Sequence, residues 1–184
     1  MIKISFLGPK GSYSYLAALK YAKKRKKIFY ELPCKNFKKI LKNIKKKKSK
    51  YAIFPIKNSV SGKINEIKKF FKKKNFFIKE KIIIPIQHCI ISKKKISLNN
   101  IKKIYSHTQP IKQCKSFLKK FPNWKIKYTN SSSEAVKKIS LKKKNNVAAI
   151  GNKKCKKLYN LYLIKENISD QKNNKTTFYI VSKK

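Results

Sequence analysis

The segment Ile2-Lys3-Ile4-Ser5-Phe6-Leu7-Gly8-Pro9-Lys10-Gly11-Ser12-Tyr13-Ser14 passes from an alternating apolar pattern through a Gly-Pro turn to a serine-rich helix start. Ile2, Ile4 and Phe6 alternate with polar residues, which predicts a half-buried strand. The glycines and proline that follow end this strand and predict a turn. Their spacing matches neither the P-loop nor the dinucleotide-binding fingerprint. The segment therefore predicts a strand–loop–helix unit without a nucleotide signature.

The same succession of strand, polar loop and helix is predicted at three further places. In an open α/β sheet such loops lie at the carboxyl ends of strands, where ligands bind. Their backbone N–H groups, hydroxyls and helix N-termini suit an anion. Ordinary helix capping is the better explanation of any single loop, but the four loops together favour a site for an anionic small molecule. In the last loop, Ser131 and Glu134 have capping-box spacing. Together with residues 8–14, the loops are residues 58–62, 106–110 and 130–133.

Apolar periodicity along the chain predicts an α/β fold with mostly parallel sheets. Short apolar runs typical of buried strands cover residues 51–56 and 147–150. Helical stripes recur at three- and four-residue spacing, which indicates amphipathic helices. These stripes are Phe37, Ile40, Leu41 and Ile44; Ile64, Ile67, Phe70 and Phe71; and Ile111, Cys114, Phe117, Leu118 and Phe121.

The charge of this chain raises nucleic-acid binding as a possible function. Its 184 residues include 51 basic and 6 acidic ones, giving a net charge of +45. Arg25 is the only arginine, however, and the guanidinium fork is the group that reads bases and grips phosphates with two hydrogen bonds. The abundance of Lys, Ile, Asn, Phe and Tyr also fits A/T-rich codons. We therefore interpret the lysines as a solvated surface, with helix-ending runs at residues 45–48 and 72–74.

Composition also argues against several other classes of protein. With 41% hydrophobic residues the chain has enough apolar material for a core. No apolar run is long enough for a membrane span, and the N-terminus lacks signal-peptide features, so we expect a cytoplasmic protein. The six acids form no spaced catalytic pair. No metal site is expected, because the cysteines lack CxxC spacing and are expected to be buried residues or free thiols: Cys34, Cys89, Cys114 and Cys155.

Five ordered stretches carry a family resemblance. From Ile2 to Val181, the chain resembles the prephenate dehydratase domain. The opening loop matches the start of that family, and His88-Cys89 matches a dipeptide at the same place. The other stretches are similar to its Pro-Ile-Glu-Asn, Ser-His-Pro-Gln and Thr-Arg-Phe elements. They are residues 55–62, residues 105–110 with Gln113-Cys114 after them, and residues 174–178.

The resemblance implies a two-lobed α/β fold like that of type 2 periplasmic binding proteins, with the active site in the cleft between lobes. Lobe one would comprise about residues 1–86 and 160–184, and lobe two about residues 87–159. The implied reaction is the decarboxylating dehydration of prephenate, a small dianion, to phenylpyruvate for phenylalanine synthesis. The family's essential threonine maps onto Thr176, and no cofactor or metal is implied. The implied substrate-binding residues are Ser12, Lys57, Asn58, Ser59, Ser106, Gln113 and Thr177.

Two departures from the family pattern change charge. Lys57 stands where the motif has glutamate, and Thr177 stands where it has arginine. We hypothesise that the two changes compensate one another, so that the charge offered to the substrate is kept. This hypothesis requires that the two side chains lie within roughly 11 Å, or two helical turns, of each other and face one cleft.

The resemblance covers only a catalytic domain, without the chorismate mutase or phenylalanine-sensing ACT domain that some relatives carry. We therefore expect activity that is insensitive to phenylalanine. Because members of this family usually dimerise, the resemblance also implies a homodimer. Two other functions stay open: a catalytically impaired protein that binds small carboxylates, and a lysine-rich nucleic-acid-binding protein. No membrane partner and no specific nucleic acid are expected.

Overall fold

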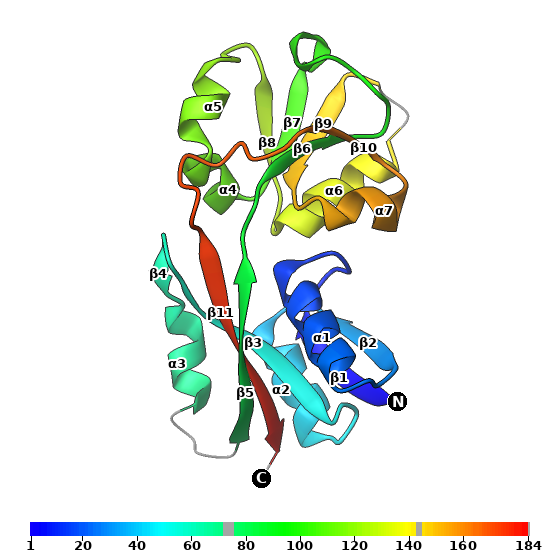
Figure 1. The fold of residues 1–184 in the computed structure, drawn as a ribbon, viewed down its shortest axis with the longest axis vertical. Coiled ribbons are helices and arrows are strands. Elements are labelled where there is room, and N and C mark those ends of the chain that lie inside the picture. The colour runs from blue at the N-terminus through cyan, green and yellow to red at the C-terminus, as the bar shows by residue number, and fades with distance from the viewer. Residues whose placement is uncertain (72–75, 143–144, 184) are drawn as a thin grey trace. The chain divides into compact units, whose positions relative to one another are not determined.

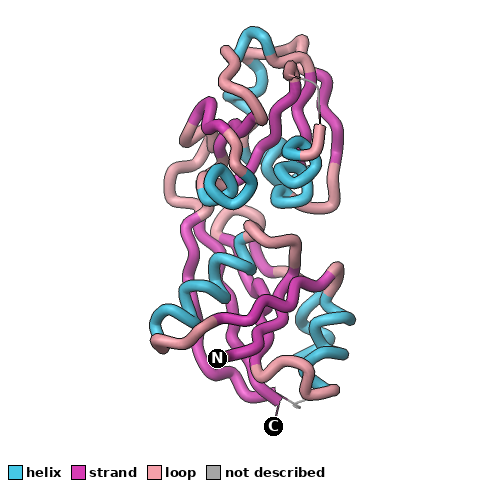
Figure 2. Tube along the Cα trace, turned by 90° about the vertical axis from the view of Figure 1, so that its right-hand side faces the viewer, coloured by secondary structure: helices cyan, strands magenta, loops and turns pink. Residues whose placement is uncertain are grey.

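The computed structural model describes residues 1–71, 76–142 and 145–183, with the side chains of residues 68–70 left out. The chain divides into two compact units, Met1–Ile86 with Asn173–Lys184 and Gln87–Lys172. Each unit contains its own sheet (Figure 1), and Figure 2 shows the helices in cyan and the strands in magenta. No described helix has the length and apolar character that crossing a membrane requires.

The sheet of the first unit is mixed. Its strand order is β2-β1-β3-β11-β5, and β4 pairs with β3 outside this path. Strand β1 runs parallel to β2 and β3, whereas β11 runs antiparallel to both β3 and β5. The strands are β1 (Ile2–Leu7), β2 (Phe29–Cys34), β3 (Tyr51–Asn58), β4 (Gly62–Lys63), β5 (Phe76–Pro85) and β11 (Lys175–Lys183).

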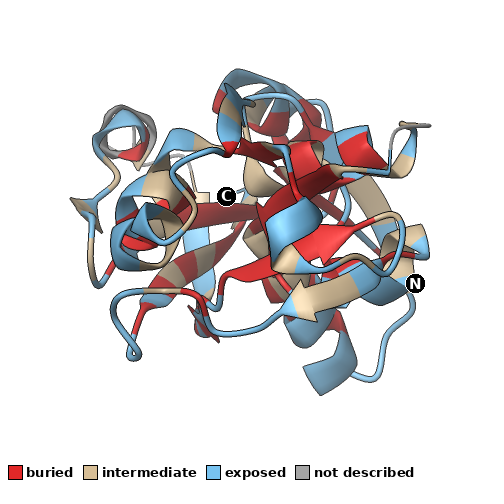
Figure 3. Cartoon of the chain, turned by 90° about the horizontal axis from the view of Figure 1, so that it is seen from above, coloured by how far each residue is buried: buried red, intermediate tan, exposed pale blue. Residues whose placement is uncertain are grey.

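Helices cover both faces of this sheet. On one face lies α1 (Tyr13–Lys24), whose Tyr15 ring packs 5.7 Å from the Phe6 ring, between centroids. The other face carries α2 (Phe37–Lys45) and α3 (Asn65–Phe71), which share one apolar cluster with Phe54 and Val181. Buried residues lie on the strands and on the helices (Figure 3), so the sheet and the helices that cover it share the core of the unit.

The second unit repeats this plan around a second mixed sheet, of order β10-β6-β9-β7-β8. Neighbouring strand residues point to opposite faces, and so Ile90 and Ile91 enter two different cores. Helices α4 and α5 cover one core, and α6 and α7 cover the other. The elements are β6 (Cys89–Ser92), a 3-10 helix (Leu98–Asn100), β7 (Lys103–Ser106), α4 (Thr108–Gln113), α5 (Lys115–Lys119), β8 (Lys125–Tyr128), α6 (Ser132–Ser140), β9 (Val147–Gly151), α7 (Lys154–Tyr159) and β10 (Tyr162–Lys165).

The α/β class and the predicted strands are confirmed, but the expectation of mostly parallel sheets is wrong. Strand β11 lies between β3 and β5 and runs antiparallel to both. In the second unit β6 is antiparallel to its two neighbours. The unit boundary also differs from the expected one at residues 159–160. Residues 160–172 belong to the second unit, because β10 pairs with β6 in that unit's sheet.

The predicted helices form with two changes. The stripe from Ile111 to Phe121 is broken at Cys114, whose φ of −124° and ψ of 28° separate α4 from α5. Residues 58–62 do not lead straight into a helix, because they form the turn between β3 and β4. Ile64 precedes α3, and the lysine run 72–74 lies outside the described residues.

Capping side chains set the helix starts, as the loop compositions predicted. The Ser12 hydroxyl caps α1 by accepting from Tyr15 N at 3.1 Å. Ser131 caps α6 by accepting from Glu134 N at 3.1 Å, and the Glu134 carboxylate accepts from Asn130 N. Asp170 caps α5 from far along the chain, since its carboxylate accepts from the backbone N–H groups of Lys115 and Ser116 at 2.9 and 3.1 Å.

We predict that Asp170→Ala lowers the free energy of unfolding by about 1 kcal/mol, because two N–H groups at the start of α5 lose a charged acceptor. Urea denaturation measures this change. Glu166→Ala is the matched control, since it removes one negative charge from an exposed ion pair with Lys153 at 3.5 Å. That pair is expected to contribute less than about 0.5 kcal/mol. Equal losses in the two variants would contradict the capping role.

Candidate active site

The Thr176 hydroxyl lies at the start of β11, beside Asn58 at the end of β3. Thr176 is buried, and its Oγ1 accepts a hydrogen bond from Asn58 Nδ2 at 2.9 Å. The same Nδ2 donates to Asn174 Oδ1 at 2.7 Å and approaches the Lys175 carbonyl oxygen at 3.2 Å. All four of these residues belong to the first unit.

The orientation of the Asn58 amide follows from its backbone contacts. Asn58 Oδ1 accepts from the backbone N–H groups of Val60 and Ser61, each at 3.0 Å, and from the Ser61 hydroxyl at 3.1 Å. Backbone N–H groups only donate, so this end of the amide must be the oxygen and the end facing Thr176 must be the NH₂ group. Thr176 Oγ1 is therefore the acceptor in its bond with Asn58, and its own proton remains to be donated elsewhere.

A β-bulge brings Asn58 to the same face of the sheet as Thr176. Thr177 is paired with Lys57 and Phe178 with Pro55, which leaves Ile56 as an extra residue in β3. An extra residue reverses the alternation of side chains for the positions beyond it. Without the bulge Asn58 would share the face of Ile56 and point away from the Thr176 hydroxyl.

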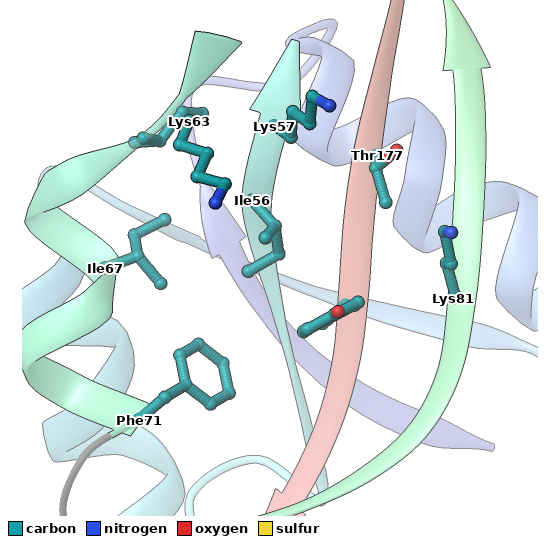
Figure 4. Close-up of a pocket in the computed structure, with 9 residues that line it drawn as sticks. Ile56, Lys57, Lys63, Ile67, Phe71, Lys81 and Thr177 are labelled. Atoms are coloured by element: carbon teal, nitrogen blue, oxygen red, sulfur yellow. The ribbon is translucent and has the colours of Figure 1, made fainter.

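The bulge also separates two predicted substrate residues from this site. Lys57 and Thr177 are directly opposed in the register and line one pocket beside α3, as Figure 4 shows. Because Thr176 and Thr177 are consecutive on a strand, their side chains point to opposite faces of the sheet. The structure thus meets the requirement that Lys57 lie near Thr177. It corrects the prediction that both contact the same ligand as Thr176, because their pocket is on the reverse face.

The three predicted serines already donate their hydroxyl protons within the protein. Ser12 donates to the Leu7 carbonyl oxygen at 2.7 Å, and the buried Ser106 donates to the His107 carbonyl oxygen at 2.9 Å. Ser59 Oγ lies 3.4 Å from the Asn173 carbonyl oxygen and accepts from Lys175 N at 2.9 Å, which ties the β3–β4 turn to the start of β11. The protons of these three serine hydroxyls are thus directed at backbone carbonyl oxygens, whereas the contact described for Thr176 Oγ1 is one that it accepts, from Asn58.

Gln113 lies in the second unit and is held by a buried histidine. Its Oε1 is 2.8 Å from His88 Nε2, and its backbone carbonyl accepts from Asp170 N at 2.8 Å. Burial lowers the pKa of the His88 imidazole, although the hydrogen bond with Gln113 acts in the opposite direction. A neutral His88 that donates from Nε2 fixes the Gln113 amide with its oxygen toward the ring and its NH₂ group away from it.

The second histidine lies at the start of α4, next to Ser106. His107 Nδ1 accepts from Gln109 N at 3.2 Å and so acts as the helix cap. Burial lowers the pKa of His107 too, but this side chain is only half-buried.

The four cysteines are buried and free of disulfides, as the sequence predicted. Burial raises the pKa of Cys114 and of Cys155 to about 12, so both remain thiols at neutral pH. The described residues contain no group of His, Cys, Asp and Glu side chains that could hold a metal ion.

Residues 4–184 match the family model of prephenate dehydratase. The chain belongs to the prephenate dehydratase family. The bifunctional chorismate mutase/prephenate dehydratase of Buchnera aphidicola subsp. Schizaphis graminum is 46% identical over 184 residues, which are 100% of this chain and 48% of that protein. The chain thus spans about half the length of this curated relative.

Two solved structures place the fold. The prephenate dehydratase from Arthrobacter aurescens, in complex with L-Phe, has a TM-score of 0.87 at 22% identity and covers 100% of this chain and 60% of its own. A methionine-binding lipoprotein from Bacillus subtilis has a TM-score of 0.50 at 15% identity over 100% of this chain and 83% of its own. These likenesses concern the fold and confirm the predicted α/β architecture related to periplasmic binding proteins.

Sequence reasoning missed part of the first-unit site. Asn174 was noticed only as the start of the threonine motif, yet its side-chain oxygen receives a hydrogen bond from Asn58. The role of His88 was likewise visible only as part of a dipeptide. The signal that could have found the Asn58 contacts is the succession Asn58-Ser59-Val60-Ser61, in which an asparagine side chain typically accepts from backbone N–H groups further on.

We predict that the folded chain loses stability below about pH 6.5. Folding lowers the pKa of His88 below the ordinary histidine pKa of about 6.5. Between the lowered pKa and the ordinary one, the unfolded chain binds the proton more readily than the folded chain does. Stability is therefore present above this range and falls as the pH falls through it. Melting temperatures from pH 8 to pH 5 measure the effect, and His88→Gln, which can still donate to Gln113, should flatten the curve. The control His107→Asn, which can still cap α4, should change it less; equal flattening by both variants would refute the assignment.

The opposed positions 57 and 177 give a second prediction. Thr177→Arg places a guanidinium opposite Lys57 and should destabilise the chain, since like charges directly across a strand pair repel. Lys57→Glu together with Thr177→Arg should instead gain a cross-strand ion pair, with a favourable coupling of about 0.2–1 kcal/mol. A double-mutant cycle in urea denaturation measures this coupling. A coupling of zero would mean that these side chains do not meet.

Proposed function

We propose that this chain catalyses the conversion of prephenate to phenylpyruvate, water and carbon dioxide, as a lyase of L-phenylalanine biosynthesis. The family membership supports the reaction. The observation that carries the proposal is the Thr176 hydroxyl, which accepts from Asn58 and keeps its proton for a substrate oxygen. A cytoplasmic location and a homodimeric assembly complete the proposal, in keeping with a biosynthetic family.

The reaction needs such a donor for a simple chemical reason. The electron pair of the breaking bond to the ring carboxylate enters the ring as carbon dioxide leaves. The bond between the ring and its hydroxyl oxygen then breaks, and that oxygen departs as hydroxide, which takes up a proton to become water. Aromatisation makes the change strongly downhill, but hydroxide is a poor leaving group. A positioned hydrogen-bond donor stabilises the charge that develops on this oxygen.

Thr176 serves this reaction by polarisation. An unperturbed hydroxyl is a weak acid, so full proton transfer from Thr176 is not required of it. The hydrogen bond from Asn58 Nδ2 occupies a lone pair of Oγ1 and fixes where the proton can point. The bonds from Val60 and Ser61 to Asn58 Oδ1 hold the amide that performs this task.

The substrate carboxylates need donors and cations in addition. Ser12 and Ser59 belong to the first unit, and Ser106 and Gln113 belong to the second unit. Their contribution to binding stays a prediction. Lys57 and Thr177 are left out of this set, because they face the reverse side of the sheet.

The first test is turnover. The purified chain is incubated with prephenate, and phenylpyruvate is followed by its ultraviolet absorbance. Thr176→Val should lower kcat by about 10²–10³-fold, the usual effect of removing one donor to a developing oxyanion. Thr177→Val, the same change one residue along, should retain most of the turnover. Substrate binding without turnover in the unmodified chain would instead favour a carboxylate-binding protein.

Asn58→Asp provides a sharper test of the hydrogen-bond direction. The carboxylate can still accept from Val60 N and Ser61 N, so the turn is preserved. It cannot donate to Thr176, and it would accept the hydroxyl proton that the substrate needs. We expect a loss of kcat of about 10²-fold, with an unchanged circular dichroism spectrum. Full activity in Asn58→Asp would exclude Thr176 as the donor.

A further inference from the structure

A pocket of about 350 Å³ lies on the face of the first sheet that carries α3. This volume is at the lower end of the range of about 300–1,000 Å³ that is typical of small-molecule sites. The wall is apolar, with Ile56 from β3, Ile67 and Phe71 from α3, and Tyr179 from β11 (Figure 4). It therefore suits the apolar body of a small ligand.

Three lysines and one hydroxyl complete the lining of this pocket. They are Lys57, Lys63, Lys81 and Thr177, which come from four different strands. No carboxylate lines the pocket among the residues that the structure describes, and none of the described ion pairs includes these lysines. The rim of the pocket is thus cationic, and no described lining residue offers it a negative charge.

The register makes this arrangement costly in the absence of an anion. Lys57 and Lys63 are directly opposed in the β3–β4 pair. Like charges at directly opposed positions destabilise a sheet. An anion between the two amines would turn this repulsion into attraction, and the Thr177 hydroxyl, opposite Lys57 on the other side, offers a further donor.

We propose that this pocket binds a small amphipathic carboxylate, with a branched or aromatic body against Ile67 and Phe71 and its carboxylate at Lys57 and Lys63. The apolar wall distinguishes this ligand from a bare anion, and the cationic rim distinguishes it from a neutral apolar molecule. The site is separate from the Thr176 hydroxyl, which points to the opposite face of β11. The proposal therefore does not depend on the proposed catalytic function.

Calorimetric titration at physiological ionic strength tests the ligand class. The probe is 4-methylpentanoate, which combines a branched apolar body with one carboxylate and does not resemble a ring substrate. Its neutral amide, acetate and inorganic phosphate are the comparison ligands. Saturable one-site binding of 4-methylpentanoate, with at least about tenfold weaker binding of the others, is expected. No binding of 4-methylpentanoate, or equal binding of acetate or phosphate, would overturn the proposal.

Variants of the lysine pair locate the site. Lys57→Gln with Lys63→Gln should weaken 4-methylpentanoate binding by at least about tenfold. Lys125→Gln with Lys127→Gln, on β8 of the second unit, makes the same change of charge and should leave binding unchanged. Thr176→Val should also leave it unchanged. An equal loss in the β8 control would mean that the overall positive charge attracts the ligand, and would contradict the proposed site.

Thermal unfolding supplies a readout that a structural role alone would not give. Without ligand, the Lys57→Gln and Lys63→Gln variant should melt at a higher temperature than the unmodified chain, because the opposed charges are removed. Its melting temperature should then rise less on addition of 4-methylpentanoate. A variant that is less stable without ligand would show that the two amines do not repel one another, and would contradict the proposed anion site.

Discussion

The antiparallel pairing of β3 with β11 is the constraint on which the first unit depends. It joins the middle of the chain to its last strand, so that residues 118 positions apart, Asn58 and Thr176, share one hydrogen bond. The register shift beside Ile56 decides which side chains face which side of the sheet. Because of this extra residue, Lys57 and Asn58 contribute to different sites on opposite faces of the sheet. Asn58 faces the Thr176 hydroxyl, while Lys57 joins Thr177 in a pocket on the reverse face.

Charge acts on this protein mostly through local contacts. The net charge of +45 suggests a general polyelectrolyte, yet the few acids hold defined positions. Glu80 forms ion pairs with Lys24 at the end of α1 and with Arg25, the residue after it. Asp170 caps α5, and its backbone N–H donates to the Gln113 carbonyl oxygen. Because the chain has only six acidic residues, few other carboxylates could take over such a contact. The lysines at the ends of helices, such as Lys45 and Lys46 of α2, are exposed, in keeping with a solvated surface.

Much of the fold was predictable because short-range patterns produce it. The alternation of Ile2, Ile4 and Phe6 gave β1, and the stripe of Phe37, Ile40 and Ile44 gave α2. The direction of β11 was not predictable, since nothing in the local pattern of residues 175–183 tells which strands will be its neighbours. The break at Cys114 was missed for a similar reason: the apolar stripe continues through it, whereas the Asp170 carboxylate that caps α5 comes from a distant part of the chain.

The sequence by itself determined the α/β class, the family resemblance and the choice of Thr176, because motifs and periodicity are properties of neighbouring residues. Tertiary structure alone decided that Asn58 donates to Thr176, that Ser12 and Ser106 spend their protons on backbone carbonyls, and that Lys57 and Thr177 face away from the Thr176 hydroxyl. The physical reason is that strand pairing joins distant segments, and a single bulged residue reverses the face on which each later side chain lies.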